Sequence, residues 1–158
     1  MSDRVHVPDP ELMRRAGRRM TTALVIMLIL TTFLTVAGIS LVAAGELAGL
    51  PLAVGGAVLE IAAIVLVVAT LRVRRTLDGR TIARSALLTA RQTANRVYRV
   101  ALVTTIALIG YGVVRLVLGD PWSLVTACVI SIGLFLLARG SKSMGLAQDQ
   151  ALNPQATS

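Results

Sequence analysis

Four long apolar stretches constrain the fold of this chain more than any other feature. They cover residues 20–44, 51–71, 100–118 and 122–138. A helix needs about 17–25 apolar residues to cross the hydrocarbon core of a bilayer. Because backbone polar groups in lipid must be hydrogen-bonded internally, each stretch is expected to be a helix. The sequence therefore predicts an all-α integral membrane protein with four spans.

The connections between the spans predict how the helices pair. Residues 45–50 separate the first span from the second, and Gly119, Asp120 and Pro121 separate the third from the fourth. Such short connections force neighbouring helices to run antiparallel. We therefore expect a four-helix bundle of two helical hairpins, which together form one membrane domain over residues 20–138.

The composition narrows the class of protein. Mean hydropathy is +0.76 and only 15% of the residues are charged, whereas a soluble domain carries about 25%. This excludes a soluble globular domain, a disordered chain and a coiled coil. Zinc, haem and iron–sulfur sites need several His or Cys ligands, and the chain has one of each, His6 and Cys128. We therefore expect no metal and no cofactor.

The basic residues predict the orientation in the membrane. Of the 16 basic residues, all but Arg115 lie in the segments 1–19, 72–99 and 139–158. The positive-inside rule then places both termini and the middle segment in the cytoplasm, as in a bacterial plasma (inner) membrane protein. All but one of these residues are arginine, a bias typical of a high-GC bacterium. Nucleic acid is not an expected partner, because the aromatic residues that stack on bases make up only 3% of the chain.

The middle segment 72–99 is basic and amphipathic. A straight third helix starting at Thr81 would extend about 27 Å beyond the bilayer, whereas the second helix would protrude by only about 9 Å. Two ends at such different heights would not meet across a short turn. We therefore expect a separate interfacial helix over about 81–94, followed by a bend near residues 95–99.

The two faces of this expected interfacial helix differ in polarity. Its polar face carries Arg80, Arg84 and Arg91, and such a face can lie at the headgroups and attract anionic lipid. Alternatively, the arginines only fix the topology, or the apolar face packs against another membrane-protein subunit. That apolar face consists of Ile82, Ala83, Ala86, Leu87, Ala90, Ala94 and Val97.

Two Asp-Pro pairs predict where helices begin. Aspartate is a preferred N-cap residue, and proline is favoured in the first helical position. We therefore expect the first helix to begin at Pro10, after Asp9, and the fourth at Pro121, after Asp120. A short cytoplasmic tail over residues 139–158 is expected to follow the fourth span.

Glu60 is the most informative single residue. It lies nine positions after Pro51, which is about 13–14 Å along the helix from the outer end of its span. A carboxylate near the middle of a bilayer costs at least about 2.5–3.5 kcal/mol. Glu60 must therefore be protonated, paired or hydrogen-bonded, or it must line a cavity.

Depth along the spans identifies the candidate partners of Glu60. Thr35 and Ser131 fall at about the same depth, and Tyr111 lies slightly nearer the outer end. Arg115 lies close to the outer surface and would reach Glu60 only by turning inward. These five residues form the candidate intramembrane polar site. Its role is a structural hydrogen bond, a contact with another subunit, or the binding of a proton or substrate.

Function is predicted mainly from what the sequence lacks. It contains no nucleotide-binding loop, no nucleophile–base pair and little extramembrane mass, and its few acids are too scattered for an enzyme. We expect a non-catalytic accessory or assembly subunit of a larger bacterial inner-membrane complex, for example a respiratory or other energy-transducing one.

The alternative is a small proton-coupled transporter that uses Glu60 and acts as a homo-oligomer. In its four spans and single embedded glutamate the chain resembles the small multidrug resistance transporters. It departs from them because this acid is on the second span and because an aromatic lining is missing.

Overall fold

The computed structural model describes residues 4–6, 10–76 and 81–152. Four of the described helices are long and apolar enough to cross a membrane, which confirms that part of the prediction. Two short strands and one turn of 3-10 helix complete the described elements. In chain order, the elements are β1 (Arg4–His6), α1 (Pro10–Ala43), η1 (Leu47–Gly49), α2 (Leu50–Arg75), β2 (Thr81–Ala83), α3 (Arg84–Val117) and α4 (Pro121–Leu152).

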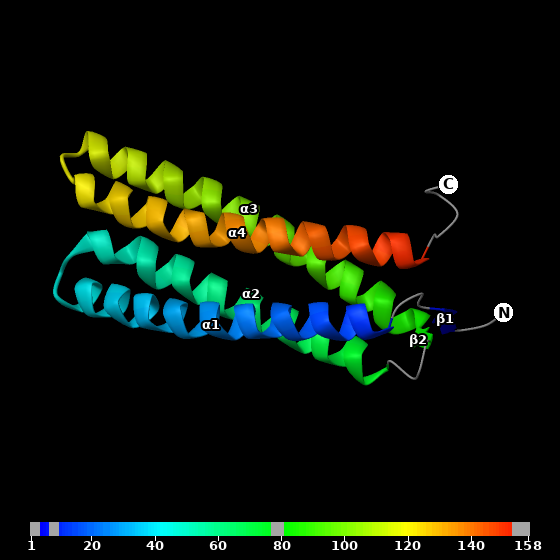
Figure 1. The fold of residues 1–158 in the computed structure, drawn as a ribbon. Coiled ribbons are helices and arrows are strands. Elements are labelled where there is room, and N and C mark those ends of the chain that lie inside the picture. Colours follow the sequence, from blue (N-terminus) through cyan, green and yellow to red (C-terminus); the bar gives the residue numbers. More distant parts are fainter. Residues whose placement is uncertain (1–3, 7–9, 77–80, 153–158) are drawn as a thin grey trace.

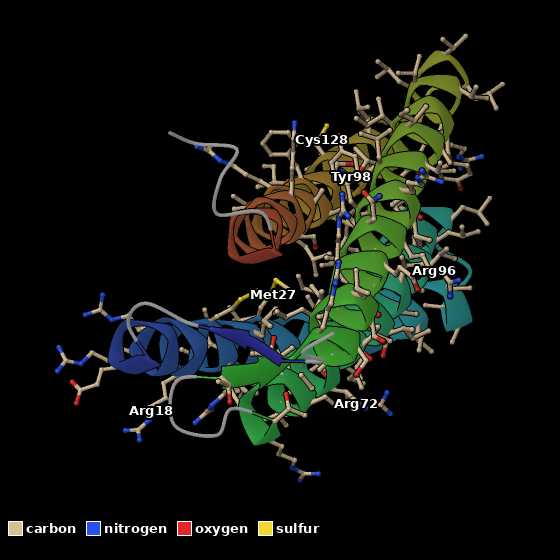
Figure 2. All side chains as sticks on the ribbon, turned by 90° about the vertical axis from the view of Figure 1, so that its right-hand side faces the viewer. Arg18, Met27, Arg72, Arg96, Tyr98 and Cys128 are labelled. Carbon is tan, nitrogen blue, oxygen red and sulfur yellow. The ribbon has the colours of Figure 1, made fainter. Side chains whose placement is uncertain are left out.

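The four helices are arranged as two antiparallel hairpins (Figure 1). Helix α1 packs against α2, and α3 packs against α4. Helix α2 also contacts both helices of the second hairpin. The start of α1, the end of α2, the start of α3 and the end of α4 lie at one end, which we call the basic end, and Arg18 and Arg72 lie there (Figure 2). The two tight turns lie at the opposite end, which we call the turn end.

Both tight turns use the same glycine-based helix termination. Gly45 follows α1 with φ of +86°, and Gly119 follows α3 with φ of +88°. The next N–H in each turn donates back to the carbonyl five residues earlier, from Glu46 to Leu41 at 2.9 Å and from Asp120 to Arg115 at 2.9 Å. These are Schellman motifs, in which glycine adopts the left-handed conformation without a steric penalty.

Helices α1 and α2 approach each other at backbone distance. A Cβ added to Gly38 would lie 2.5 Å from the backbone nitrogen of Ala53 and 2.9 Å from the carbonyl oxygen of Gly49. One Cβ added to Gly49 would lie 2.5 Å from the carbonyl oxygen of Gly38. Small residues of this kind let helices pack closely in apolar surroundings. The α1–α2 hairpin therefore depends on the absence of side chains at these two positions.

The core lies where α2 meets the second hairpin. Leu59 and Leu66 of α2 and Ile130 and Leu134 of α4 are almost completely buried. Helix α1 reaches this cluster mainly through Leu24. The opposite faces of α1 and α3 expose large aliphatic and aromatic side chains, among them Phe33, which is 77% exposed.

The expected interfacial helix over 81–94 and the bend near residues 95–99 are wrong. Residues 84–117 form one uninterrupted helix, α3, and residues 81–83 form strand β2. The predicted apolar face exists, since Leu87, Ala90 and Ala94 are at most 2% exposed, but it packs inside the molecule. The prediction assumed parallel helices, whereas α3 is inclined (Figure 1). The start of α3 consequently lies beside the end of α2, where Thr76 and Ser85 line one cavity.

The strands and the end of α4 also differ from expectation. Strand β1 pairs antiparallel with β2, with Val5 opposite Ile82, and no sequence pattern here is long enough to predict this pairing. Helix α4 continues to Leu152, so residues 139–152 are helical, and residues 153–158 lie outside the described part. The predicted starts of α1 at Pro10 and α4 at Pro121 are confirmed. Asp9 lies outside the described residues.

The close α1–α2 contact yields a stability prediction. Replacing Gly38 with Leu should lower the free energy of unfolding by at least about 1–3 kcal/mol, because the new side chain would meet backbone atoms that cannot move aside. Unfolding by sodium dodecyl sulfate, followed by circular dichroism, measures this change. Gly110→Leu is the matched control, since an added Cβ there meets nothing within 4 Å. Equal destabilisation by both substitutions would contradict the packing described.

Candidate functional site

Glu60 lies on the side of α2 that faces α1. Gly56 is one helical turn before it, and Gly56 contacts the hydroxyl of Thr35 on α1. Residues four apart share a helix face, so Glu60 projects toward the same neighbour. Its side chain is half-buried, and its Oε1 is buried without a hydrogen-bond partner among the described residues.

The threonines of α1 do not donate to Glu60. Gly38 lies against Ala53 and Thr35 against Gly56, so the next turn of this antiparallel pair brings Thr31 to the level of Glu60. The Thr35 hydroxyl donates to the Thr31 carbonyl oxygen at 2.9 Å, and the Thr31 hydroxyl donates to carbonyl oxygens of its own helix. Both protons are thus used within α1, and only hydroxyl lone pairs remain available to a protonated carboxyl group.

Ser131 is a second unpartnered polar group at this depth. It is 6% exposed on α4, and its Oγ has no hydrogen-bond partner in the described part of the chain. The neighbouring Ile130 contacts Gly55 of α2, which places Ser131 within about two helical turns of Glu60 in depth. No hydrogen bond joins the two side chains. The structure therefore contains two orphaned oxygens in its middle layer, on different helices.

Tyr111 and Arg115 lie at the turn end and have partners there. The Tyr111 hydroxyl donates to the Leu47 carbonyl oxygen at 3.3 Å. The Thr126 hydroxyl donates to the adjacent Ala48 carbonyl oxygen at 2.8 Å. Together these bonds attach η1, the loop of the first hairpin, to the second hairpin. Sequence reasoning missed Thr126, because only the fold brings residue 126 beside residue 48.

Arg115 pairs with Asp120, so an inward turn toward Glu60 is not what the structure shows. Its Nη2 lies 2.9 Å from the Asp120 Oδ2. Asp120 also caps α4, since the backbone N–H of Ser123 donates to its Oδ1 at 3.3 Å and the Ser123 hydroxyl donates to its Oδ2 at 2.6 Å. Arg115 and Asp120 are separated by a Schellman turn, and this spacing could have identified the pair from sequence.

The surroundings of Asp120 favour its charged form. The hydrogen bond from the Ser123 hydroxyl, followed by the one from Arg115, holds the pKa of Asp120 below its ordinary value of 3.8. A carboxylate that accepts several hydrogen bonds is stabilised relative to the protonated acid. Arg115 and Asp120, the charged residues at the turn between α3 and α4, are therefore paired with each other.

Of the three arginines predicted to contact lipid, the structure describes two. Arg80 lies outside the described residues. Arg84 is the first residue of α3 and is exposed, and Arg91 is exposed two turns further along the same helix. Both lie at the basic end, and lipid contact through them stays a prediction.

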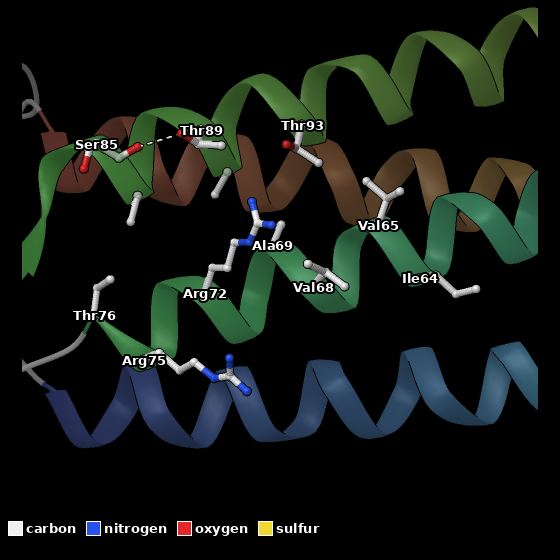
Figure 3. A pocket seen from close by; sticks show the side chains of 12 residues that line it. Ile64, Val65, Val68, Ala69, Arg72, Arg75, Thr76, Ser85, Thr89 and Thr93 are labelled. Carbon is white, nitrogen blue, oxygen red and sulfur yellow. Dashed lines mark hydrogen bonds between the residues drawn. The ribbon is translucent and has the colours of Figure 1, made fainter.

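A cavity of about 500 Å³ opens between the end of α2 and the start of α3 (Figure 3). Sequence reasoning missed it, although two spacings point to it: Arg72 and Arg75 are three apart on α2, and hydroxyl residues recur every four positions on α3. The cavity is lined by Ile64, Val65, Val68, Ala69, Arg72, Arg75, Thr76, Ser85, Ala86, Thr89, Ala90 and Thr93.

Comparisons of the chain with protein-family models, with curated proteins and with solved structures found no match in any of the three. Within the described residues, no three His, Cys, Asp or Glu side chains lie close enough together to hold a metal ion. The function must therefore be argued from the arrangement of the residues themselves.

The Asp120 network yields a pH prediction. Because the folded-state pKa of Asp120 lies below 3.8, its stabilising contribution is present above about pH 3.8 and is lost as the pH falls through the folded-state value. Asp120→Asn keeps an acceptor for Ser123 but does not titrate. The stability difference between wild type and Asp120→Asn should therefore shrink as the pH is lowered from 5 to about 2. A difference that stays constant over this range would contradict the pairing.

Proposed function

We propose that this chain is a non-catalytic accessory or assembly subunit of a larger bacterial inner-membrane complex. The observation that supports the proposal is the dispersal of the five side chains of the predicted intramembrane polar site. Tyr111 and Arg115 bind the turns, Thr35 binds its own helix, and Glu60 and Ser131 stand on separate helices. A catalytic site needs such groups to converge on a common point, and in the described residues they do not.

The exposed helix faces provide the surface that such a subunit would use. Helix α1 packs on α2 along one side, and its other side is mainly apolar between residues 23 and 43, where Thr32 and Ser40 are the exposed hydroxyl residues. Apolar faces of this kind pack equally well against lipid or against helices of another subunit. The most exposed large side chains on α1 are Ile26, Ile29, Leu30, Phe33, Val36 and Ile39.

The orientation belongs to the same proposal. The basic end contains the start of α1, the end of α2, the start of α3 and the end of α4, and the positive-inside rule assigns such an end to the cytoplasm. The turn end, with its two short loops, would then face the opposite side. This arrangement leaves only the basic end with enough extramembrane chain to contact soluble partners.

The alternative function is a small proton-coupled transporter that acts as a homo-oligomer, and Glu60 supports it. A buried carboxyl oxygen without a hydrogen-bond partner among the described residues is costly in the middle of a bilayer. Intramembrane acids of this kind are often proton carriers. In this alternative, Glu60 is the residue that takes up and releases the proton.

The accessory proposal predicts co-purification. A tagged full-length chain, extracted in a mild detergent and analysed by native gel and mass spectrometry, should run with larger membrane subunits in fixed stoichiometry. The larger subunits should stay bound in digitonin and be lost in a harsher detergent, since the contacts depend on apolar helix faces. A chain that purifies alone or as a homodimer under the mildest conditions would contradict the proposal.

Glu60→Gln separates the two functions. If Glu60 is structural, the variant should fold, keep its partners and show no altered proton movement. If the chain is a transporter, the variant should lose pH-gradient-driven uptake of a cationic dye into proteoliposomes, because the glutamine amide cannot take up and release the coupling proton. Glu46→Gln is the matched control, since Glu46 is exposed at the turn end.

A further inference from the structure

The cavity between α2 and α3 has two chemically different ends. Its deeper end is formed by Ile64, Val65 and Val68 of α2, which offer only aliphatic carbon. Its other end, at the basic end of the molecule, is formed by Arg72, Arg75 and the first turns of α3. Figure 3 shows Arg72 extending from α2 toward α3, across the space that the cavity occupies. The cavity is thus shaped for an amphipathic ligand.

The polar end of the cavity is positively charged. Among the described residues, no carboxylate forms an ion pair with Arg72 or Arg75, and no acid lines the cavity. The first turn of α3 adds to this potential, because Ser85 and Ala86 line the cavity and Ala83 provides no side-chain cap for the helix N–H groups. The Arg72 guanidinium and the uncapped helix N-terminus face the cavity, and Arg75, whose guanidinium points toward α1 in Figure 3, adds positive charge at its rim. Together these groups favour an anion.

Hydroxyl groups of α3 supply further hydrogen-bonding capacity. Thr89 donates to the Ser85 carbonyl oxygen at 2.9 Å, so its proton is already used. The hydroxyls of Ser85 and Thr93 make no hydrogen bond within the described part of the chain and are available as donors. These groups match a phosphate, which presents several acceptor oxygens.

The spacing along α2 matches a lipid that lies in a bilayer. Ile64 and Arg72 are separated by eight residues, or about 12 Å of helix. Arg72 and Arg75 occupy the last turn of the membrane-length stretch of α2, the level at which headgroup phosphates are found. A volume of about 500 Å³ lies within the range of about 300–1,000 Å³ that is typical of small-molecule sites.

We propose that the cavity between α2 and α3 binds one anionic glycerophospholipid. Its phosphate pairs with Arg72 and accepts from the Ser85 hydroxyl, Arg75 adds positive charge at the rim, and the first part of an acyl chain lies along Ile64, Val65 and Val68. The proposal rests on the membrane placement of the chain but not on its accessory role. A free phosphate would leave the apolar end of the cavity unused.

Native mass spectrometry of the full-length protein in detergent tests this site. Phosphatidylglycerol and phosphatidylcholine with identical acyl chains are titrated in parallel, so that only the headgroup differs. The first molecule of phosphatidylglycerol should bind more tightly than the first molecule of phosphatidylcholine. Arg72→Gln and Arg75→Gln should each weaken phosphatidylglycerol binding about fivefold, the effect expected for one basic residue near a lipid surface. Arg139→Gln, which removes an exposed arginine outside the groove, should leave binding unchanged.

A second variant and a competitor separate the possible ligands. Val68→Phe fills the apolar end without changing charge, and it should weaken phosphatidylglycerol binding while circular dichroism stays unchanged. Inorganic phosphate should not displace the lipid. Equal binding of the two lipids, or unchanged binding in the Arg72→Gln/Arg75→Gln double variant, would overturn the proposal. Displacement by inorganic phosphate would show a free-anion site instead and would also overturn it.

Discussion

The rest of the structure depends on helix contacts made through small residues. Between apolar helices in apolar surroundings the hydrophobic effect gives little drive, so close packing must hold the helices together. Gly38 and Gly49 allow the backbones of α1 and α2 to touch, and Gly55 admits Ile130 of α4. On α3, a face of alanines that includes Ala90 and Ala94 is buried along its inner side. Because α2 has small residues on two faces, it packs against α1 of its own hairpin and against both helices of the second hairpin.

This packing leaves the polar side chains with mostly structural tasks. At the turn end, Tyr111 and Thr126 attach the loop of one hairpin to the other, and Arg115 and Asp120 close the second turn. At the basic end, β1 and β2 join the segment before α1 to the segment before α3. The two hairpins are thus linked at both ends by hydrogen bonds and in the middle by aliphatic contacts. Glu60 is the one acid within the described membrane-length stretches, and this scheme does not use it.

Local chemistry made part of the fold predictable. Apolar length identified the four helices, and the Asp-Pro pair before α4 marked its first residue, because both signals act within a few neighbouring residues. The continuity of α3 was not predictable in this way: the apolar face around Leu87 was evident, but its burial depends on the inclination of α3 against α2. Depth counting likewise matched Arg115 to Glu60 and overlooked Asp120, five residues along the chain. The lipid-sized groove arises only where α2 and α3 meet.

Helix α3 is continuous over residues 84–117, with its inner face of small residues packed inside the molecule, and one distance along it tests this arrangement most directly. Leu88 and Val113 are exposed on α3, so both accept spin labels once Cys128, the free exposed cysteine of the described chain, is replaced by Ser. Pulsed electron spin resonance of Leu88→Cys/Val113→Cys in lipid nanodiscs should give one narrow distance near 37 Å, the span of 25 helical residues. A distance below about 30 Å would show a bend between the two labels and contradict the continuous helix.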